Sequence, residues 1–297
     1  MKANHFRTGY VALIGKPNTG KSTLMNALLG EKVSITAHKP QTTRHQLLGI
    51  KTTEDYQCIF VDTPGIHDHQ KKAINRYMNR AATSMLNDVD LVCVLLEARK
   101  ITAEDEKILT LIKPLKQVVI VLNKIDQRGR HELLPVMARI SELAPDREII
   151  PVSALKKDNL EHLQEELVGY LPQAIPHFPD DQLTDKPMRF FVSEIIREKL
   201  FRTLTQELPY AITVDVELYK VESDIIRIAA SIWVERKSQK GIVIGKKGEM
   251  LKKIGAQARQ DIERLADNKV YLQLWVKVRE GWSDDERSLA AFGYANE

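Results

Sequence analysis

Residues 15–22, GKPNTGKS, constrain the fold more strongly than any other part of the chain. They match the pattern G-x-x-x-x-G-K-[ST], follow the apolar run YVALIG and precede a segment with helical patterning. Glycines let successive backbone N–H groups turn inward, and the start of the following helix adds positive potential, so such a loop binds phosphate. A glycine-rich turn without a ligand would not need this context. The segment therefore predicts an α/β domain with a phosphate-binding loop.

The residue types within this loop predict separate tasks. We expect Lys21 to reach the β- and γ-phosphates of a nucleotide, and the Ser22 hydroxyl to bind Mg²⁺. The residues predicted to surround the phosphates are Gly15, Lys16, Pro17, Asn18, Thr19, Gly20, Lys21, Ser22 and Thr23.

Further apolar runs follow in the first half of the chain. They are YQCIFVD from residue 56, LVCVLLE from 91, QVVIVLN from 117 and EIIPVSA from 148. Several are apolar at consecutive positions, which is typical of strands covered on both faces in a parallel sheet. The segments between them are long enough for crossover helices. The pattern predicts an α/β fold with a doubly wound, mostly parallel sheet.

The sequence DTPG closes the run that begins at residue 56. An acidic residue at the carboxyl end of a strand, here Asp62, can hold Mg²⁺, usually through water, and the N–H of Gly65 can approach a γ-phosphate. The predicted nucleotide contacts in this motif are Asp62, Thr63, Pro64, Gly65 and Ile66.

Upstream of this motif, residues 33–46, VSITAHKPQTTRHQ, form a polar segment that predicts a mobile loop. Thr43, or as second choice Thr42, can give another hydroxyl to Mg²⁺ when a γ-phosphate is present. The alternative is that both threonines are ordinary β-branched residues of an edge strand. We assign Ser22 and Thr43 as the metal ligands.

The sequence NKID follows the run from residue 117, at the sheet edge where ligands bind in α/β folds. The Asp126 carboxylate can accept hydrogen bonds from N1–H and N2–H₂ of guanine, whereas adenine would leave that charge desolvated and unpaired. The Lys124 stem can lie over the base, and residues 153–155 can bring N–H groups to guanine O6. The predicted base contacts are Asn123, Lys124, Ile125, Asp126, Ser153, Ala154 and Leu155.

The second half of the chain has a different pattern. Residues 172–187 hold four prolines without periodicity, which predicts a linker. A helix near 191–204, the strands ITVDVEL and IRIAASIWVE, two helices within 241–266 and the strand VYLQLWVKV predict helices on one face of a three-stranded sheet. We expect a nucleotide-binding domain at 1–172, a linker at 173–186 and a smaller α+β domain at 187–297. Trp275 is predicted to be a core residue, and Trp282 to lie in an exposed tail where either role is open.

The sequence GKKG at residues 245–248 lies between the two helices predicted in this half. A GxxG loop with lysines is the device by which KH domains clamp an RNA backbone, although a bland helix–helix turn is the alternative. Residues 236–264 contain nine Lys or Arg against three acidic residues, which favours RNA. Isoleucines at 242, 244 and 254 are expected to line an apolar groove. The predicted RNA contacts are Ile242, Ile244, Gly245, Lys246, Lys247, Gly248, Lys252 and Lys253.

Composition limits the class and compartment. Cys58 and Cys93 lie in apolar runs and are predicted to be buried thiols, and two thiols do not form a disulfide framework, so we expect a reducing compartment. The N-terminus shows no secretory signal, and no apolar run reaches the ~18–20 residues of a membrane span. A pI near 8.8 permits a nucleic-acid or anionic-membrane partner without requiring one. The prediction is a cytoplasmic monomer with at most peripheral contact to the inner membrane face.

The motifs GKPNTGKS, QTTRH, DTPG, NKID and SAL, in this order, resemble those of translation-factor-related GTPases. The QTTRH form, the GKKG module, the helix SEIIREKLFRTLTQELPY and the ending WVKVREGWSDDERSLAAFGY resemble the Era family over the whole chain. The resemblance implies a P-loop GTPase domain followed by a type II KH domain, with GTP or GDP as ligand. It also implies small-subunit ribosomal RNA near its 3′ end and the 30S-type subunit as partners, and a role in assembling that subunit.

Hydrolysis of GTP is expected to be slow without help. Ras-like switches use a glutamine after the DxxG motif to orient the attacking water, and this position holds Ile66. Arg44, His45 and His67 are polar side chains nearby, and none is assigned as a base. Related GTPases with asparagine at the position of Asn18 bind K⁺ in place of an arginine finger, which predicts K⁺ as a further cofactor.

The residues that we assign to catalysis are Lys21, Thr43, Asp62, Gly65 and Asn18. His67 and His69 are interpreted as loop histidines rather than metal ligands, because no further ligands have suitable spacing. One alternative function stays open, a GTP-regulated adaptor whose basic half docks on protein or anionic membrane. A scaffold without hydrolysis fits poorly with the presence of Lys21, Ser22 and Asp62.

Overall fold

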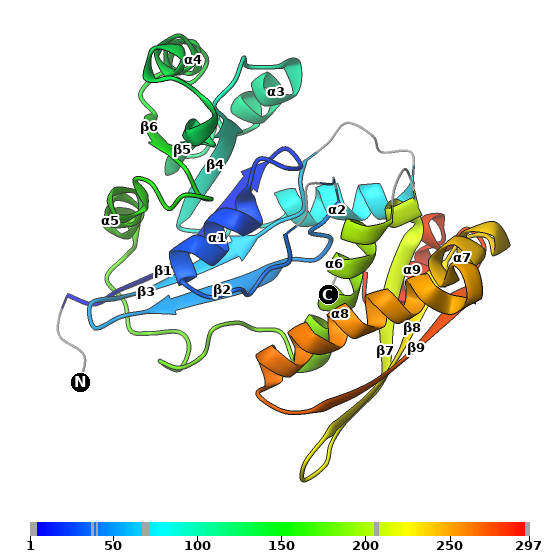
Figure 1. The fold of residues 1–297 in the computed structure, drawn as a ribbon. Coiled ribbons are helices and arrows are strands. Elements are labelled where there is room, and N and C mark those ends of the chain that lie inside the picture. Colours follow the sequence, from blue (N-terminus) through cyan, green and yellow to red (C-terminus); the bar gives the residue numbers. More distant parts are fainter. Residues whose placement is uncertain (1–4, 37–38, 40, 67–71, 205–207, 295–297) are drawn as a thin grey trace. The chain divides into compact units, whose positions relative to one another are not determined.

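The computed structural model describes residues 5–36, 39, 41–66, 72–204 and 208–294. The chain divides into two units, residues 1–70 with 78–185 and residues 71–77 with 186–297 (Figure 1). His67 and His69, for which the sequence predicts a loop role, lie outside the described residues.

The first unit is built on a six-stranded sheet with the strand order β2-β3-β1-β4-β5-β6. Its strands are β1 (Arg7–Gly15), β2 (Leu47–Thr52), β3 (Tyr56–Asp62), β4 (Leu91–Glu97), β5 (Val118–Asn123) and β6 (Glu148–Val152). Neighbours are parallel except for β2, which runs antiparallel to β3. The predicted mostly parallel sheet is confirmed. The sequence did not predict β2, because an edge strand needs no continuous apolar run, and LLGIKT is only partly buried.

Helices cover both faces of this sheet. The helices of this part of the chain are α1 (Lys21–Leu29), α2 (Ala73–Thr83), α3 (Ala103–Leu111), α4 (Arg130–Leu143) and α5 (Leu160–Tyr170). Helix α1 contacts α5 and β2, whereas α3 contacts α4. Ile108 of α3 and Ile140 of α4 pack with alternate side chains of β4 and β5 in one buried cluster. All six residues of β5 are buried, as expected for a strand between two helical layers.

Residues 173–185, most of the predicted linker, are hydrogen-bonded along the first unit. The N–H of Ile50 donates to the carbonyl of Leu183 (2.9 Å), and the N–H of Leu48 donates to a carboxylate oxygen of Asp185 (3.0 Å). The Gln57 side chain accepts from the backbone N–H groups of residues 177 and 178 at 2.8 and 3.0 Å. The proline-rich segment therefore has no regular secondary structure, yet its backbone is held along its length.

The second unit contains a three-stranded sheet with the order β7-β8-β9. Its elements are α6 (Met188–Thr203), β7 (Ile212–Val221), β8 (Ile226–Val234), α7 (Lys237–Ile244), α8 (Glu249–Ala266), β9 (Val270–Val278) and α9 (Glu286–Ala291). Strand β8 is antiparallel to β7 and parallel to β9. Buried side chains of α6, α7 and α8 pack on one face of the sheet, as predicted.

The two tryptophans near the C-terminus differ from their predictions. Trp275 is 43% exposed, so the prediction of a core residue is wrong. It pairs with Ser231 on the face of the sheet opposite α6, α7 and α8, because its neighbour Val276 takes the core-facing position. Trp282 is fully buried, and its indole N–H donates to the carbonyl of Ala211 (3.0 Å). The predicted exposed tail is therefore folded at this point.

Cys58 and Cys93 are buried, as predicted. Burial raises the pKa of the Cys93 thiol to about 12, and burial likewise raises the pKa of Cys58. Among the helices of the described residues, none combines the length and apolar character needed to span a bilayer.

Candidate functional site

The strand register brings the predicted nucleotide motifs to one edge of the first sheet. Strand β1 lies between β3 and β4, with Leu13 opposite Asp62 and Gly15 opposite Leu95. Further along, Asn123 at the end of β5 lies opposite Val152, directly before the predicted base contacts at 153–155. Because parallel strands end at the same edge, segments that are far apart in the sequence meet there.

The phosphate-binding loop is folded around Lys21. Its ammonium donates to the carbonyls of Gly15 (3.0 Å) and Lys16 (2.9 Å). Burial lowers the pKa of Lys21 to about 8, and the nearby charge of Asp62 opposes this shift. Gly20 has φ 101°, and a Cβ there would lie 2.3 Å from the side-chain nitrogen of Asn123, so only glycine fits.

Hydroxyl groups converge on the buried carboxylate of Asp62. The Ser22 hydroxyl lies 2.6 Å from Asp62 Oδ2 and 2.8 Å from the Thr43 hydroxyl, which is itself 3.5 Å from Oδ2. The structure thus brings together the residues predicted to bind Mg²⁺. Ser34 also donates to Oδ2 (2.9 Å), a contact that the sequence did not predict. The sequence pointed to Ser34 only by its place in the same polar segment as Thr43.

The second oxygen of Asp62 shows that this cluster suits a cation. Asp62 is 0% exposed, and within the described residues its Oδ1 has no hydrogen-bond partner. Burial raises the pKa of Asp62, while the hydrogen bond from Ser22 and the charge of Lys21 oppose the shift. A buried carboxylate oxygen without a partner is costly, and a hard cation with oxygen ligands would satisfy it.

The Lys16 side chain takes a role that the sequence did not predict. It was expected only among the phosphate contacts, but its ammonium is buried and donates to Asp105 (2.7 Å) and Thr102 (2.8 Å). Thr102 and Asp105 also form the capping box of α3. The phosphate loop is therefore tied to the start of α3 through a buried ion pair.

The DTPG motif lies directly beside the phosphate loop. The Thr63 hydroxyl donates to the carbonyl of Leu13 (2.7 Å), and the N–H of Ile66 donates to the carbonyl of Gly15 (3.1 Å). Arg44, one of the nearby polar side chains, is fully buried. Ile66 packs against a buried apolar cluster, so its side chain is not placed to orient water.

The predicted base contacts form one hydrogen-bonded frame. Asp126 accepts from the Ser153 hydroxyl (2.6 Å), which orients the carboxylate. Asn123 donates to the carbonyl of Thr19 (2.8 Å) and accepts from the N–H of Ala154 (3.0 Å). Guanine O6 would therefore have to share the Ala154 donor with Asn123.

Lys124 is positioned from two sides. Its ammonium donates to the carbonyl of Asn18 (2.6 Å) and pairs with Glu97 (2.9 Å). Glu97 was not predicted, although an acidic residue at the carboxyl end of β4 is a signal for this edge of the sheet. These contacts hold the Lys124 ammonium between the phosphate loop and the end of β4.

In the second unit, residues 245–248 join α7 to α8 as predicted. Gly245 has φ 74°, and a Cβ there would lie 2.6 Å from Met250 Cβ, so glycine is required. Lys246, Lys247, Lys252 and Lys253 are exposed, and none of them has an ion pair within the part of the chain that the structure describes. No side chain caps the start of α8, which leaves its first N–H groups available to an anion.

The predicted apolar groove is formed only in part. Ile242 is 56% exposed and Ile244 is partly exposed, so both are accessible. Ile254 is 0% exposed and packs in the core against the sheet, so the expectation that bases rest on it is wrong. The helical repeat places Ile254 with Ala258 and Ile262 on the buried side of α8.

Comparison with known proteins identifies both halves. Residues 10–124 match a family model described as a 50S ribosome-binding GTPase, and residues 207–283 match a KH domain model. The chain is 49% identical to GTPase Era of Azotobacter vinelandii over 98% of both chains, and 50% identical to GTPase Era of Ectopseudomonas mendocina over 97% of both.

Two solved structures share the whole fold. Era in complex with MgGDPNP and nucleotides 1506–1542 of 16S ribosomal RNA has a TM-score of 0.95 and 41% identity, with 98% of this chain covered. An Aquifex aeolicus Era variant bound to GDP and AlF4⁻ also has a TM-score of 0.95, with 40% identity. The chain binds guanine nucleotides and hydrolyses GTP, and with its GTPase fold, its KH domain and these relatives it belongs to the Era family of GTPases.

Proposed function

We propose that this GTPase is a switch that binds small-subunit ribosomal RNA near its 3′ end and acts in assembly of that subunit. The observation that carries the proposal is the cluster of exposed lysines around the GKKG loop, which have no ion pair among the described residues, on a KH domain joined to a GTPase. The solved relative that holds nucleotides 1506–1542 of 16S ribosomal RNA supports the choice of RNA.

In the nucleotide pocket, Ser22 and Thr43 are proposed to hold Mg²⁺ through their hydroxyls, with Asp62 behind them. This ion would neutralise charge on the β- and γ-phosphates. The unpartnered Oδ1 of buried Asp62 supports the assignment. Lys21 supplies a second positive charge, and the Gly65 N–H is the proposed contact to the γ-phosphate.

Hydrolysis is proposed to be slow in the isolated protein, because Ile66 cannot orient water. We further propose that K⁺ near Asn18 compensates part of the charge that develops in the transition state. Single-turnover GTP hydrolysis in K⁺ and in Na⁺ at equal ionic strength tests this. Equal rates in the two salts would remove K⁺ from the proposal.

The chain that follows the DTPG motif connects the nucleotide site to the RNA-binding unit. The start of α2, which follows the DTPG motif in the chain, belongs to the second unit. There Lys72 pairs with Glu235 (3.4 Å), and the N–H of Ala73 donates to Asp284 (2.8 Å). We propose that the nucleotide state influences the RNA-binding unit through the start of α2, because this part of the helix is anchored in that unit.

The test is RNA crosslinking from cells, compared between a GTP-locked and a nucleotide-free protein. We expect crosslinks concentrated near the 3′ end of small-subunit ribosomal RNA, with a yield that depends on the nucleotide state. Crosslinks without sequence preference, together with tight binding to anionic vesicles, would favour the membrane-docking adaptor instead.

A further inference from the structure

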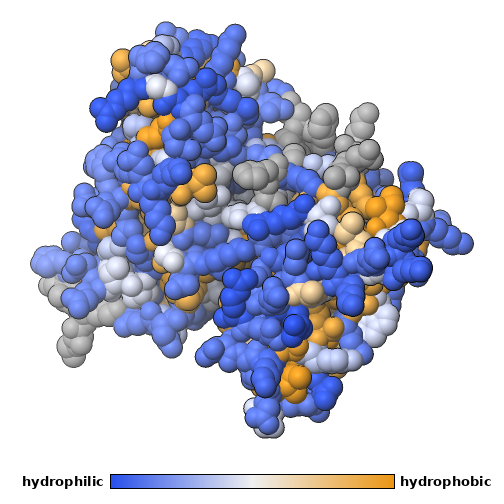
Figure 2. All heavy atoms as spheres, viewed as in Figure 1, coloured by the Kyte–Doolittle hydropathy of each residue, from blue (hydrophilic) through white to orange (hydrophobic). Residues whose placement is uncertain are grey.

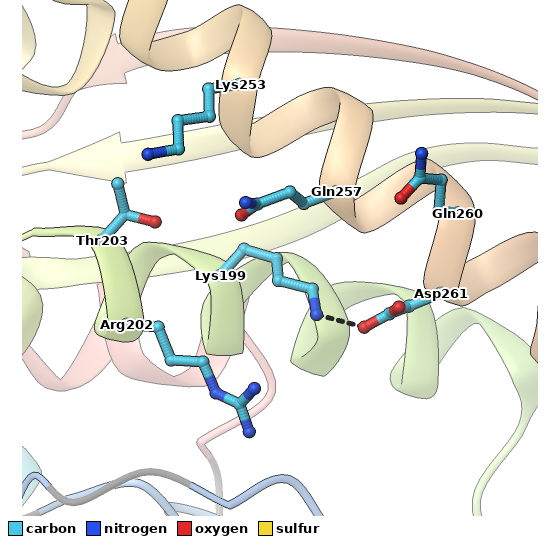
Figure 3. A pocket seen from close by; sticks show the side chains of 7 residues that line it. All are labelled: Lys199, Arg202, Thr203, Lys253, Gln257, Gln260 and Asp261. Atoms are coloured by element: carbon cyan, nitrogen blue, oxygen red, sulfur yellow. Dashed lines mark hydrogen bonds and ion pairs between the residues drawn. The ribbon is translucent and has the colours of Figure 1, made fainter.

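A polar cavity of about 480 Å³ opens between α6 and α8 in the second unit (Figure 3). It lies on the flank of α8 that faces α6, and it includes Lys253, which the sequence predicted among the RNA contacts of the GKKG module. Its lining carries three cations, one carboxylate, and uncharged hydrogen-bonding groups. The lining residues are Lys199, Arg202, Thr203, Lys253, Gln257, Gln260 and Asp261.

The acidic groups beside this cavity are already neutralised. Asp261 is in contact with both Lys199 and Arg264. Arg202 pairs with Glu198 (2.6 Å), which is itself fully buried. Because Lys199 and Arg202 are used in these pairs, Lys253 is the cation of the lining that has no carboxylate partner within the described residues.

Three hydrogen-bonding side chains point into the same space. Figure 3 shows the Lys253 ammonium directed toward Thr203, with the Gln257 amide beside them. Over the residues that the structure describes, none of these three side chains has a hydrogen bond or ion pair. Lys253 and Gln257 come from α8 and Thr203 from the last turn of α6, so both helices position the group.

We propose that this cavity binds a phosphate group of the RNA backbone, as a second contact beyond the GKKG loop. The inference rests on the proposed RNA function. One ammonium, one hydroxyl and one amide suit phosphate oxygens, and no aromatic side chain lines the cavity to stack on a base. The site therefore adds affinity and orientation without adding sequence preference.

The cavity lies along the helix that begins at the clamp. Lys253 and Gln257 follow Gly248 by five and nine residues, which places them roughly 8 and 14 Å along α8. Figure 2 shows hydrophilic atoms along this helix, which agrees with a surface that meets a charged backbone. An RNA that contacts only the GKKG loop would leave the cavity unoccupied, whereas one that also follows the flank of α8 toward α6 would fill it.

The test uses the variant Gln257→Glu, which places a carboxylate beside Lys253 with almost no change in shape. The control is Gln273→Glu on β9, an exposed glutamine outside the cavity and the clamp. Binding of a tetranucleotide and of a longer RNA is measured over a range of salt concentrations, with the full-length protein. We expect Gln257→Glu to weaken binding of the longer RNA about fivefold. The slope of the logarithm of the binding constant against the logarithm of the salt concentration should fall in magnitude by about 0.7, as for one lost phosphate contact. The control variant should change neither the affinity for the longer RNA nor its salt dependence.

The result that would overturn the cavity assignment is an equal effect of the two glutamine variants on the longer RNA. An equal loss with the tetranucleotide would do the same, because the effect would then act on the clamp. Inorganic phosphate supplies a further arm: if Gln257→Glu abolishes thermal protection by phosphate and leaves the longer RNA unaffected, the site binds a free anion and not RNA. A wild-type protein that binds neither RNA would instead contradict the proposed function itself.

Discussion

The nucleotide pocket and the GKKG clamp are both proposed to bind phosphate groups, but the charged side chains are buried in the pocket and exposed in the clamp. In the pocket, Lys21 and Asp62 are buried, and each is hydrogen-bonded to its surroundings, Lys21 to backbone carbonyls and Asp62 to hydroxyl groups. In the clamp, Lys246 and Lys247 are exposed and have no ion pair in the described part of the chain. A buried frame fixes one ligand in one geometry, whereas exposed lysines act through a field that tolerates movement.

This contrast explains why the two regions should respond differently to substitution. Removing one partner from a buried charged pair leaves the other desolvated, which costs several kcal/mol. Removing an exposed lysine changes stability by about 0.5 kcal/mol or less and acts mainly on binding. Matched substitutions in the two regions should therefore differ in the size of their effect and in the property that they change.

The largest effect is expected for a buried lysine of the phosphate loop. Lys16→Met should lower the free energy of unfolding of the first unit by about 3 kcal/mol, because Asp105 loses its cation. Lys246→Met in the clamp is the matched change and should alter it by less than about 0.5 kcal/mol. Urea unfolding of both variants gives the comparison. Equal stabilities would mean that the Lys16–Asp105 pair contributes nothing.

A smaller loss is expected in the base pocket. Asp126→Asn should weaken GDP binding by about 2 kcal/mol, or roughly 30-fold, and improve binding of xanthine nucleotides, because the amide can donate to the xanthine oxygen. Calorimetry with GDP and XDP measures both. Asp146→Asn, on an exposed turn of the same unit, is the control and should change neither. An unaltered preference for guanine over xanthine would contradict the base-pocket assignment.

The clamp should show an effect on RNA alone. Lys246→Asp with Lys247→Asp should weaken RNA binding about tenfold at low salt and leave GDP affinity near normal, because these lysines contact only backbone phosphates. The same charge change at exposed Lys113 and Lys116 is the control. If RNA affinity survives the first pair of substitutions, the clamp lies elsewhere on the chain.

The smallest effect is expected for the two cysteines. Burial raises the pKa of both thiols, so neither Cys58 nor Cys93 should be alkylated at neutral pH while the protein is folded. Mass spectrometry after iodoacetamide treatment, with and without urea, is the measurement. Labelling of the folded protein would show that the sheet opens on the time scale of the reaction.

Much of the nucleotide site could be predicted because its functional residues lie in short contiguous motifs. A loop such as GKPNTGKS needs its glycines and lysine at fixed spacing, and a parallel sheet must bring strand ends to one edge. Contacts between residues of different motifs could not be predicted in this way. Ser34 beside Asp62 and Glu97 beside Lys124 depend on loop paths that no local pattern specifies.

Two predictions in the second unit went against the period of the apolar residues. In β9 the alternate apolar residues face the core, and Trp275 lies on the other face with Gln273 and Lys277, so the alternation argued against a core role. In α8 the helical repeat places Ile254 with Ala258 and Ile262 on the buried side, so it was not available to an exposed groove. In both elements the pattern was correct, and the assignment of one residue was wrong.

The order of residues along the chain was enough to predict the phosphate loop, the guanine motif, the GKKG turn and the two fold classes, because each depends on local backbone conformation or on the period of apolar residues. Which side chains are buried together became known only from the packed layers, from the Lys16–Asp105 pair to the cavity between α6 and α8. Burial and pairing depend on distances between residues remote in the chain, and these distances are set only when the layers pack.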